Sequence, residues 1–320
     1  MISDKATTSA MHLVDPELRE GLKSFPDIQL DQAQLSLFRG LAAGSGECLE
    51  LPDLIEDRLV VEVAGGEVGL IVCRPRSREL LPAVCCLHGG GLVAGTAQAM
   101  AAQRRGTAID LNAVLVFVDY RLAPEHPFPA PLEDCYAALR WMFTQGAAHG
   151  IDVNRIAVSG ISAGGGLAAA LSILTRDRGE FAIVYQHLLC PMLDDRTCVE
   201  PDPHPFAGQF VWTRQSNRFG WRSYLGREPG DSGVSYYAAP ARAADLTGLP
   251  PTYLAVGALD LFLEENLDYG RRLTRAGVAC ELHVYPGVFH GAAAIPDAQV
   301  CKNWEADSQR ALARALRAKV

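Results

Sequence analysis

Short apolar runs and amphipathic stretches follow one another along this chain, as expected where strands and helices alternate. Two strands with alternating polarity, Leu59–Val63 and Val68–Cys73, are predicted to form a hairpin across Gly65 and Gly66. The later apolar runs are too short for helices and predict buried strands. These runs are Ala83–Leu87, Val114–Val118, Ile156–Ser159, Ile183–Leu189, Tyr253–Val256 and Glu281–Tyr285.

Helical periodicity occupies the intervals between the strands. The predicted helices are Leu132–Phe143, Leu167–Leu174, Glu264–Ala276 and Val300–Ala318. Another helix is predicted near the N-terminus at Asp31–Ala43, with Leu37, Phe38 and Leu41 on one face. Strands that alternate with helices build a mostly parallel sheet covered on both faces. The chain is therefore predicted to be an α/β protein, and its opening hairpin makes the sheet mixed.

The alternation stops between Arg196 and Pro240, and aromatic residues concentrate there. The segment contains Phe206, Phe210, Trp212, Phe219, Trp221, Tyr224, Tyr236 and Tyr237. Such an insertion either packs on itself or covers an apolar ligand site. We favour a lid, in which Phe210 and Trp212 are candidates for contact with a substrate.

Composition excludes several classes of protein. With 29 Lys and Arg against 37 Asp and Glu, the net charge is −8, which argues against a nucleic-acid partner. The uncharged stretches Leu80–Gln103 and Ile156–Leu174 are long enough to suggest membrane spans, but glycines interrupt both, so a strand, turn and helix are predicted instead. The first 20 residues lack the apolar run of a signal peptide, which predicts a cytoplasmic protein. The nine cysteines have no zinc-site spacing, so we expect reduced thiols and no metal.

A candidate nucleophile lies in the sequence Gly160-Ile161-Ser162-Ala163-Gly164. This GxSxG motif follows a predicted strand and opens a predicted helix, which is the setting of a strained turn that exposes a serine. Because a serine hydroxyl is a weak nucleophile at neutral pH, Ser162 requires a base and a carboxylate that orients the base.

Both partners are found downstream, each just after a predicted strand. Asp260 follows Tyr253–Val256, and His290 follows the strand that ends at Tyr285. The carboxyl ends of parallel strands share one edge of the sheet, so Ser162, Asp260 and His290 are predicted to meet there as a catalytic triad. The alternatives are His283 as the base, which we expect on a face of the sheet, and Glu264 or Asp268 as the carboxylate.

The sequence His88-Gly89-Gly90-Gly91 follows another buried strand. Glycines leave backbone N–H groups open to a substrate, so Gly89, Gly90 and Ala163 are predicted to form an oxyanion hole. The same segment has a rival interpretation as a dinucleotide-binding turn, Gly89-x-Gly91-x-x-Ala94 with Asp119 as the ribose ligand. That would make the chain an NAD(P)-dependent oxidoreductase, but it leaves the triad unexplained. A second misleading motif, Gly230–Gly233, is interpreted as a solvated turn.

The motifs resemble the hormone-sensitive-lipase-like family of α/β hydrolases, which includes bacterial carboxylesterases. The matching segments are HGGG at His88–Gly91, DYRLAPEHPFPA at Asp119–Ala130, GISAGGG at Gly160–Gly166, PMLD at Pro191–Asp194, LPPTYLAVGALD at Leu249–Asp260 and GVFHG at Gly287–Gly291. The resemblance implies an α/β-hydrolase fold with a central sheet of about eight strands and a helical cap. It further implies a serine carboxylesterase with the triad Ser162, Asp260 and His290, and no metal or organic cofactor.

The resemblance also implies how the chain is divided. Residues 1–50 would supply cap helices, 51–195 the first part of the core, 196–240 a cap insertion, and 241–320 the second part of the core. His88, Gly91 and Ile161 join Phe210 and Trp212 as candidate substrate contacts. Ile161 departs from the family, in which an acidic residue usually precedes the nucleophile.

The expected reaction is hydrolysis of short to medium acyl or aryl esters through an acyl-enzyme intermediate. Amidase or lactonase activity with the same triad is one alternative, and a non-catalytic ligand-binding protein is another. The expected partner is a small ester molecule, with neither membrane nor nucleic acid, and the family allows a homodimer.

Overall fold

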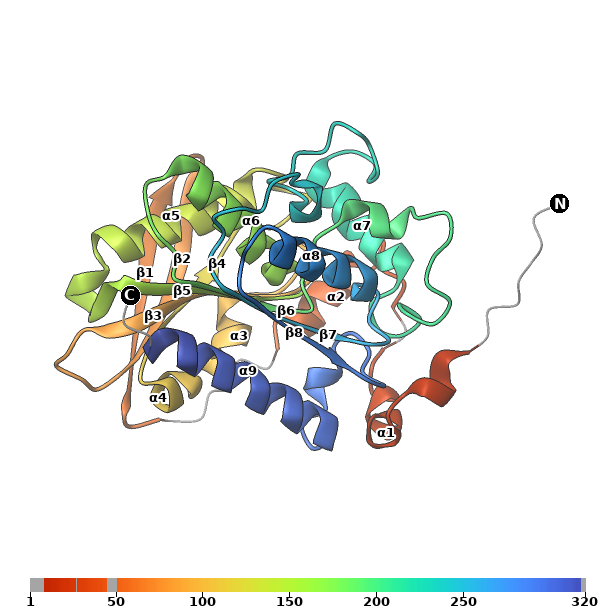
Figure 1. The fold of residues 1–320 in the computed structure, drawn as a ribbon, viewed down its shortest axis with the longest axis horizontal. Helices are drawn as coiled ribbons and strands as arrows, with labels where there is room; N and C mark the ends of the chain where they lie inside the picture. The colour runs from red at the N-terminus through yellow and green to blue at the C-terminus, as the bar shows by residue number, and fades with distance from the viewer. Residues whose placement is uncertain (1–8, 27, 45–50, 318–320) are drawn as a thin grey trace.

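One mixed sheet of eight strands runs through the computed structural model and carries helices on both faces (Figure 1). The structure describes residues 9–26, 28–44 and 51–317. Parts of the predicted cap segment 1–50, and Ala318 at the end of the last predicted helix, lie outside these residues. The strand order is β1-β2-β4-β3-β5-β6-β7-β8.

Every predicted strand is present, and most extend beyond their predicted bounds. They are β1 (Leu54–Val63), β2 (Gly66–Pro75), β3 (Leu81–Leu87), β4 (Val114–Asp119), β5 (Ile151–Ile161), β6 (Tyr185–Leu189), β7 (Thr252–Gly257) and β8 (Cys280–Tyr285). The first two pair antiparallel as the predicted hairpin, and β2 pairs antiparallel with β4. The strands from β3 to β8 run parallel to one another, so their carboxyl ends meet at one edge.

Helices cover both faces of the sheet, with α5, α6 and α8 on one and α3, α4 and α9 on the other (Figure 1). The helices are α1 (Arg19–Leu22), α2 (Leu35–Ala42), α3 (Ala97–Arg104), α4 (Thr107–Leu111), α5 (Ala130–Thr144), α6 (Ala163–Arg178), α7 (Arg214–Leu225), α8 (Leu263–Arg275) and α9 (Gln299–Arg317). Short 3-10 turns lie at Ala10–Leu13, Pro16–Leu18, Gly146–His149, Asp195–Cys198, Pro240–Arg242 and Ala292–Ala294. In the part of the chain that the structure describes, no helix combines the length and the apolar content that a bilayer crossing requires.

The apolar strands bury side chains on both faces, as parallel strands in such a sheet do. In β3, for example, Cys85 belongs to the cluster beneath α5 and α6, whereas Val84 and Cys86 belong to the cluster beneath α3 and α9. The apolar runs of the interior strands therefore correspond to strands with no solvated side, whereas the edge strand β8 leaves Leu282 and Val284 exposed.

The N-terminal helix α2 differs from its prediction. It begins at Leu35 rather than Asp31, because the Asp31 carboxylate accepts hydrogen bonds from two backbone N–H groups and forms a turn instead. Leu37 and Leu41, predicted on an apolar face, are 60% and 53% exposed. The face that packs inward carries Leu35 and Phe38.

The aromatic insertion contains helix α7, which the sequence analysis missed. Trp221 and Tyr224 of this helix are buried in the main core cluster, so these rings pack against the sheet layer rather than only on each other. The N-terminal segment lies beside the insertion, since the N–H of Leu30 donates to Ser216 Oγ at 3.0 Å. The two segments predicted to form a cap are thus neighbours in space.

Candidate active site

Ser162 occupies a sharp turn between β5 and α6. Its backbone has φ 56° and ψ −121°, a strained conformation for a residue other than glycine. The turn needs its flanking glycines, because a Cβ on Gly160 would lie 2.1 Å from the Gly164 carbonyl oxygen, and one on Gly164 would lie 2.1 Å from that of Leu87. The sequence GxSxG therefore forms the exposed-serine turn that its context predicts.

The structure brings Ser162, His290 and Asp260 into one hydrogen-bonded chain. Ser162 Oγ lies 2.9 Å from His290 Nε2, and His290 Nδ1 lies 2.7 Å from Asp260 Oδ2. Because Nδ1–H donates to the carboxylate, Nε2 is left as the acceptor for the serine proton. The other Asp260 oxygen accepts the N–H of Phe262 at 2.9 Å, which fixes the carboxylate.

Contacts between loops hold Asp260 and His290 at this spacing. The N–H of Leu259 donates to the Val288 carbonyl at 2.9 Å, and the N–H of Ala258 donates to that of Tyr285 at 2.8 Å. A Cβ on Gly257 would meet the Val288 carbonyl oxygen at 2.2 Å, so a glycine is required for this approach. The loops after β7 and β8 are therefore locked together.

The environment of His290 favours its positive charge. Burial by itself lowers the pKa of the imidazole, but the charge and hydrogen bond of Asp260, together with the neighbouring Cys190, outweigh burial and raise that pKa well above the usual histidine range. The ring is also covered by Trp212 and Phe262, with centroid distances of 6.2 and 5.1 Å. This arrangement stabilises an imidazolium, which is the state a base reaches after it accepts a proton.

Two carbonyl groups of the HGGG loop are anchored by side-chain hydrogen bonds. The Tyr120 hydroxyl donates to the His88 carbonyl at 2.7 Å, and His88 Nδ1 donates to the Gly89 carbonyl at 2.8 Å. In a trans peptide the N–H points opposite to the C=O, so the amides of Gly89 and Gly90 face away from these anchors. A Cβ on Gly89 would lie 3.4 Å from the Cβ of Ser162, which shows how close the loop is to the serine.

That the amides of Gly89, Gly90 and Ala163 form an oxyanion hole stays a prediction. Ala163 is the first residue of α6, where a backbone N–H has no acceptor within the helix. Gly90 has φ 124°, and a Cβ there would lie 2.1 Å from the Ala94 carbonyl oxygen. Side chains are excluded at this loop both by conformation and by space.

The predicted substrate contacts are placed unequally. Trp212 lies over the site, since a Cβ on Gly91 would be 2.2 Å from its ring. Ile161 lies against Gly89. Phe210 instead makes an edge contact with Phe289 at 6.0 Å, one residue before the histidine.

His88 plays a part that the sequence did not specify. Its ring stacks on Tyr120 at a centroid distance of 4.1 Å and is buried, and burial lowers its pKa. A neutral His88 therefore orients the glycine loop.

The alternative catalytic residues lie elsewhere. His283 on β8 bonds Glu281 at 2.9 Å, stacks on Tyr285 and makes a tilted ring contact with Tyr253 on the face covered by α9. Glu264 is exposed on α8, and Asp268 is paired with Arg271. None of these side chains is hydrogen-bonded to Ser162 or His290 in the described structure.

A second serine–histidine pair is buried beneath the site. Ser159 and His187 face each other on β5 and β6, 2.9 Å apart, and the other ring nitrogen bonds Ser308 of α9 at 2.9 Å. The second ring nitrogen of His187 therefore faces the Ser308 hydroxyl, whereas the corresponding nitrogen in a catalytic triad faces a carboxylate. The buried Asp195 is ion-paired with Arg242 at 2.6 Å. Burial, followed by the charge of Arg104, lowers the pKa of His187 to about 3. The pair joins the sheet to α9.

The two misleading motifs have structural explanations. Asp119, offered as a ribose ligand, accepts the N–H of Ala97 at 2.9 Å at the start of α3. The space at Gly91 is filled by Trp212, so the loop has no room for a pyrophosphate. The oxidoreductase interpretation is not favoured.

Gly230–Gly233 lies in turns, and Asp231, Ser232 and Gly233 are exposed.

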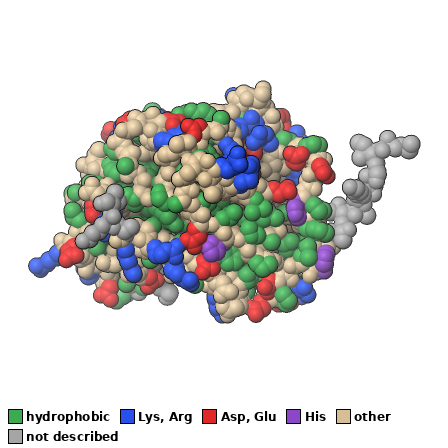
Figure 2. Space-filling model, viewed as in Figure 1, with side chains coloured by type: hydrophobic (Ala, Val, Ile, Leu, Met, Phe, Trp, Pro, Cys, Tyr) green, Lys and Arg blue, Asp and Glu red, His purple; other side chains and the backbone are tan. Residues whose placement is uncertain are grey.

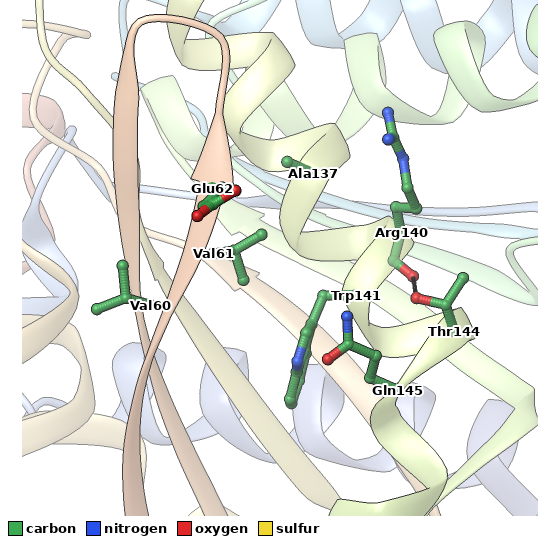
Figure 3. A pocket seen from close by; sticks show the side chains of 8 residues that line it. All are labelled: Val60, Val61, Glu62, Ala137, Arg140, Trp141, Thr144 and Gln145. Carbon is green, nitrogen blue, oxygen red and sulfur yellow. Dashed lines mark hydrogen bonds between the residues drawn. The ribbon is translucent and has the colours of Figure 1, made fainter.

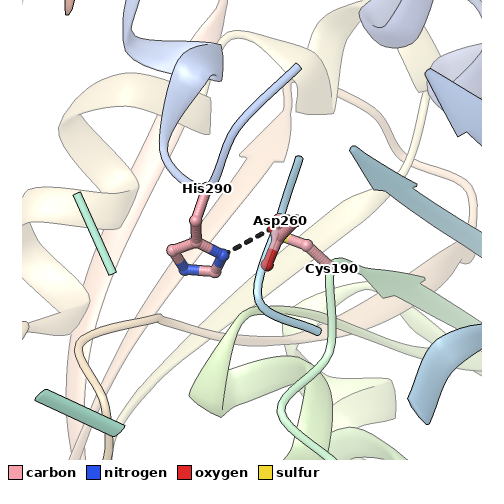
Figure 4. Close-up of side chains that lie close together, drawn as sticks. All are labelled: Cys190, Asp260 and His290. Atoms are coloured by element: carbon pink, nitrogen blue, oxygen red, sulfur yellow. Dashed lines mark hydrogen bonds and ion pairs between the residues drawn. The ribbon is translucent and has the colours of Figure 1, made fainter. Parts of the chain in front are cut away.

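One set of donor atoms in the described residues has the composition of a metal site. Cys190, Asp260 and His290 place one such atom each within 4.8 Å of the others (Figure 4). However, the hydrogen bond from His290 Nδ1 to Asp260 already uses the nitrogen that a cation would need. The expectation of no metal stays a prediction.

Sequence reasoning missed two neighbours of the histidine. Phe262 presents its ring to His290 edge on, and Cys190 follows β6 at the same sheet edge. Cys190 could have been identified from its position just after a buried strand, because Asp260 was identified from the same kind of position after a different strand.

A separate hollow of about 380 Å³ lies between β1 and α5 (Figure 3). Its walls include Val60 and Glu62 from the strand and Arg140 and Trp141 from the helix. It shares no residue with the serine site.

Known proteins resemble the chain in both sequence and structure. Residues 84–294 match a family model described as alpha/beta hydrolase fold. Esterase LipI of Mycobacterium tuberculosis is 33% identical over 87% of this chain and 87% of its own length. Ethyl acetate hydrolase of Pseudomonas putida is 28% identical over 82% of this chain and 83% of its own. A solved structure named Bacterial Heroin Esterase has a TM-score of 0.90 and 37% identity, covering 97% of this chain and 100% of that one.

Proposed function

Because the chain belongs to the hormone-sensitive-lipase-like family of α/β hydrolases, we propose that it hydrolyses carboxylic esters through an acyl-enzyme formed on Ser162. The observation that carries the assignment is the unbroken hydrogen-bonded chain from Ser162 through His290 to Asp260. Esterases among the similar proteins support this reaction over amide or lactone cleavage, over hydride transfer and over ligand binding without catalysis.

In the first half of the reaction, Ser162 Oγ attacks the ester carbonyl while His290 Nε2 takes the hydroxyl proton. The resulting imidazolium is stabilised by Asp260, which is 2.7 Å from Nδ1. When the tetrahedral intermediate breaks down, the bond to the alkoxy oxygen cleaves and His290 returns the proton to it. The alcohol leaves, and the acyl group remains as an ester of Ser162.

In the second half, water replaces the alcohol. The water oxygen attacks the acyl carbon while His290 removes one proton from the water. His290 then gives this proton to Ser162 Oγ as the bond to the acyl carbon breaks and the acid departs. The amides of Gly89, Gly90 and Ala163 would stabilise the negative oxygen of both intermediates. One such donor contributes about 3 kcal/mol to the transition state.

The substrate class that we propose is a short to medium acyl or aryl ester. The apolar Trp212 and Ile161 border the serine site, and a similar protein is named for ethyl acetate, a short acyl ester. Ile161 offers no charge at the position before the nucleophile, which favours an uncharged substrate group there.

We also propose that residues 1–50 and 196–240 form the cap, around core segments 51–195 and 241–320. In support, Phe38 of α2 contacts Trp212 of the insertion, at a centroid distance of 6.2 Å, and Trp212 lies over the glycine loop. Substrate size would then be set by side chains from both cap segments.

A homodimer paired along β8 is a further part of the proposal. β8 is an edge strand, and Leu282 and Val284 are 38% and 41% exposed. Figure 2 shows hydrophobic side chains gathered over this part of the molecule. Sedimentation should give a dimer that Val284→Lys dissociates; a monomer at all concentrations would contradict the proposal. We also propose a cytoplasmic location, in line with buried cysteines such as Cys85, Cys86 and Cys135, which are thiols rather than disulfides.

The test of the reaction is a panel of p-nitrophenyl esters of increasing acyl length, with turnover measured for the native chain and for Ser162→Ala. The variant should lose roughly 10⁴-fold or more in kcat, and a serine-directed phosphonate should label the peptide containing Ser162. Ser159→Ala is the matched control and should keep its activity, because Ser159 bonds the enclosed His187. If Ser162→Ala stays active or the label maps elsewhere, the assignment is wrong.

A further inference from the structure

Cys190 lies immediately behind the aspartate–histidine pair. It follows the last residue of β6 and adopts φ 37°, a conformation uncommon for a residue with a side chain. The side chain is buried, and its Sγ lies within 4.8 Å of the facing atoms of Asp260 and His290 (Figure 4). The reaction proposed above gives this thiol no task.

The backbone around Cys190 is bonded to the catalytic elements. The N–H of Cys190 donates to the Ala255 carbonyl of β7 at 2.6 Å, and the carbonyl of Leu189 accepts the N–H of Ser162 at 2.8 Å. Two residues further on, the N–H of Met192 donates to the Ser162 carbonyl at 3.0 Å. The position of the thiol is thus tied to the position of the nucleophile and to the strand that delivers Asp260.

We propose that Cys190 is a positioning residue for ester hydrolysis: its neutral thiol closes the inner side of the Asp260–His290 pair and holds the imidazole in the orientation that meets Ser162. The inference rests on the proposed function of that triad. Sulfur is soft and polarizable, so it also favours the imidazolium that forms when His290 accepts a proton.

The surroundings explain why a thiol fits this place. The groups that titrate or carry charge around His290 are Asp260 and Cys190, with the hydroxyl of Ser162 on the other ring nitrogen. The rings of Trp212 and Phe262 cover the rest of the imidazole. Burial raises the pKa of Cys190, so it adds no second negative charge beside the carboxylate. A smaller side chain would leave a gap into which the imidazole could tilt.

The experiment compares Cys190→Ala, Cys190→Ser and Cys135→Ala. Cys135 is another buried thiol, on α5, and controls for the loss of a core sulfur. For Cys190→Ala we expect kcat to fall about fivefold with KM nearly unchanged, the size of one weak hydrogen bond. The acid limb of kcat/KM should move to lower pH by roughly half a unit. Cys190→Ser keeps a polar hydrogen and should recover most of kcat.

A purely structural role would lower the melting temperature of Cys190→Ala and Cys135→Ala alike and leave both pH profiles unchanged. That result would overturn the proposal, and so would a kcat of Cys190→Ala within twofold of the native value. Phosphonate labelling of Ser162 in the Cys190 variants separates the two proposals. If labelling persists while kcat is unaffected, only the role of Cys190 fails. If Ser162 is never labelled in the native chain, the triad assignment fails first.

Discussion

At the scale of single residues, the serine site depends on backbone positions that tolerate few side chains. Ser162 accepts a strained conformation with φ 56°, and the loop facing it uses Gly90 at φ 124°. Strain of this kind persists only where neighbouring contacts enforce it, and the hydrogen bonds from Ser162 N–H and to its carbonyl provide such contacts. The chemistry of the site is therefore prepared by the backbone before any substrate arrives.

Gly90→Ala should damage turnover far more than stability. Its Cβ would lie 2.1 Å from the Ala94 carbonyl oxygen, so the loop must shift and misdirect the predicted amide donors. We expect kcat to fall by about 10²-fold or more, the usual effect of losing an oxyanion donor. Gly179→Ala is the control, because Gly179 also has positive φ but has nothing near its Cβ. Equal kcat values for the two variants would place the oxyanion site elsewhere.

Asp260→Asn should change the pH dependence of the reaction. His290 acts as a base only when neutral, so activity disappears as pH falls through its pKa. Because Asp260 raises that pKa in the native chain, the acid limb of kcat/KM should lie above pH 6.5, the ordinary histidine value. In Asp260→Asn the limb should move down and kcat should drop about 10⁴-fold. Glu264→Gln, which alters an exposed carboxylate on α8, should reproduce the native profile.

At the scale of elements, the short helix α2 is attached to the core by one arginine in addition to the packing of Leu35 and Phe38. Arg39 donates to the carbonyls of Val93 and Ala123, at 2.8 and 3.0 Å, and to both oxygens of Glu125. Val93 lies in the loop that begins with the HGGG motif, so this contact connects the N-terminal segment to the predicted oxyanion loop. Leu37 and Leu41 are exposed and contribute little to holding the helix.

Arg39→Ala should therefore alter substrate recognition more than catalysis. Without the arginine, α2 and its Phe38 would lose their fixed position beside Trp212. We expect KM for the preferred ester to rise about fivefold, with a smaller change in kcat and little loss of stability, because Glu125 is half exposed. Arg218→Ala breaks an exposed ion pair on α7 and serves as the control. An unchanged KM across the ester panel would show that α2 does not border the substrate.

At the scale of the whole molecule, the buried hydrogen bonds of His187 connect the sheet to α9. Burial lowers its pKa from 6.5 to about 3, so the folded chain holds the ring neutral where an unfolded chain would protonate it. The stabilisation is complete above pH 6.5 and is lost as pH falls from there toward 3. Acid should thus destabilise the fold before it protonates the paired surface carboxylates.

The measurement is the free energy of urea unfolding at several pH values for the native chain and for His187→Gln. In the native chain, His187 alone should contribute a slope on the order of 1 kcal/mol per pH unit below pH 6.5, and the variant should lose that part of the slope. At pH 7 the folded variant should still hydrolyse esters, because Ser162 bonds His290 instead. Loss of turnover in a folded His187→Gln protein would make the Ser159–His187 pair the reactive one.

Much of the fold and of the candidate site could be predicted because each depends on local signals. The strands were visible as short apolar runs, and GxSxG, Asp260 and His290 each follow one of them. Helix α7 was missed because its buried rings, Trp221 and Tyr224, face a core assembled from distant segments. The prediction of which face of α2 packs inward was wrong for a similar reason. That face contacts Trp212 and core residues that are distant in the sequence.

The sequence by itself determined the eight strands and the larger helices that alternate with them, the tight turn at Ser162 and the triad side chains at the carboxyl edge. Short-range backbone sterics and hydrophobic periodicity depend on consecutive residues, so these features can be predicted from sequence. Tertiary structure alone showed that Ser159 and His187 form a second, buried pair, that Trp212 covers Gly91, and that Cys190 lies behind His290. These contacts join residues far apart in the chain, and only the packing of the whole sheet sets their distances.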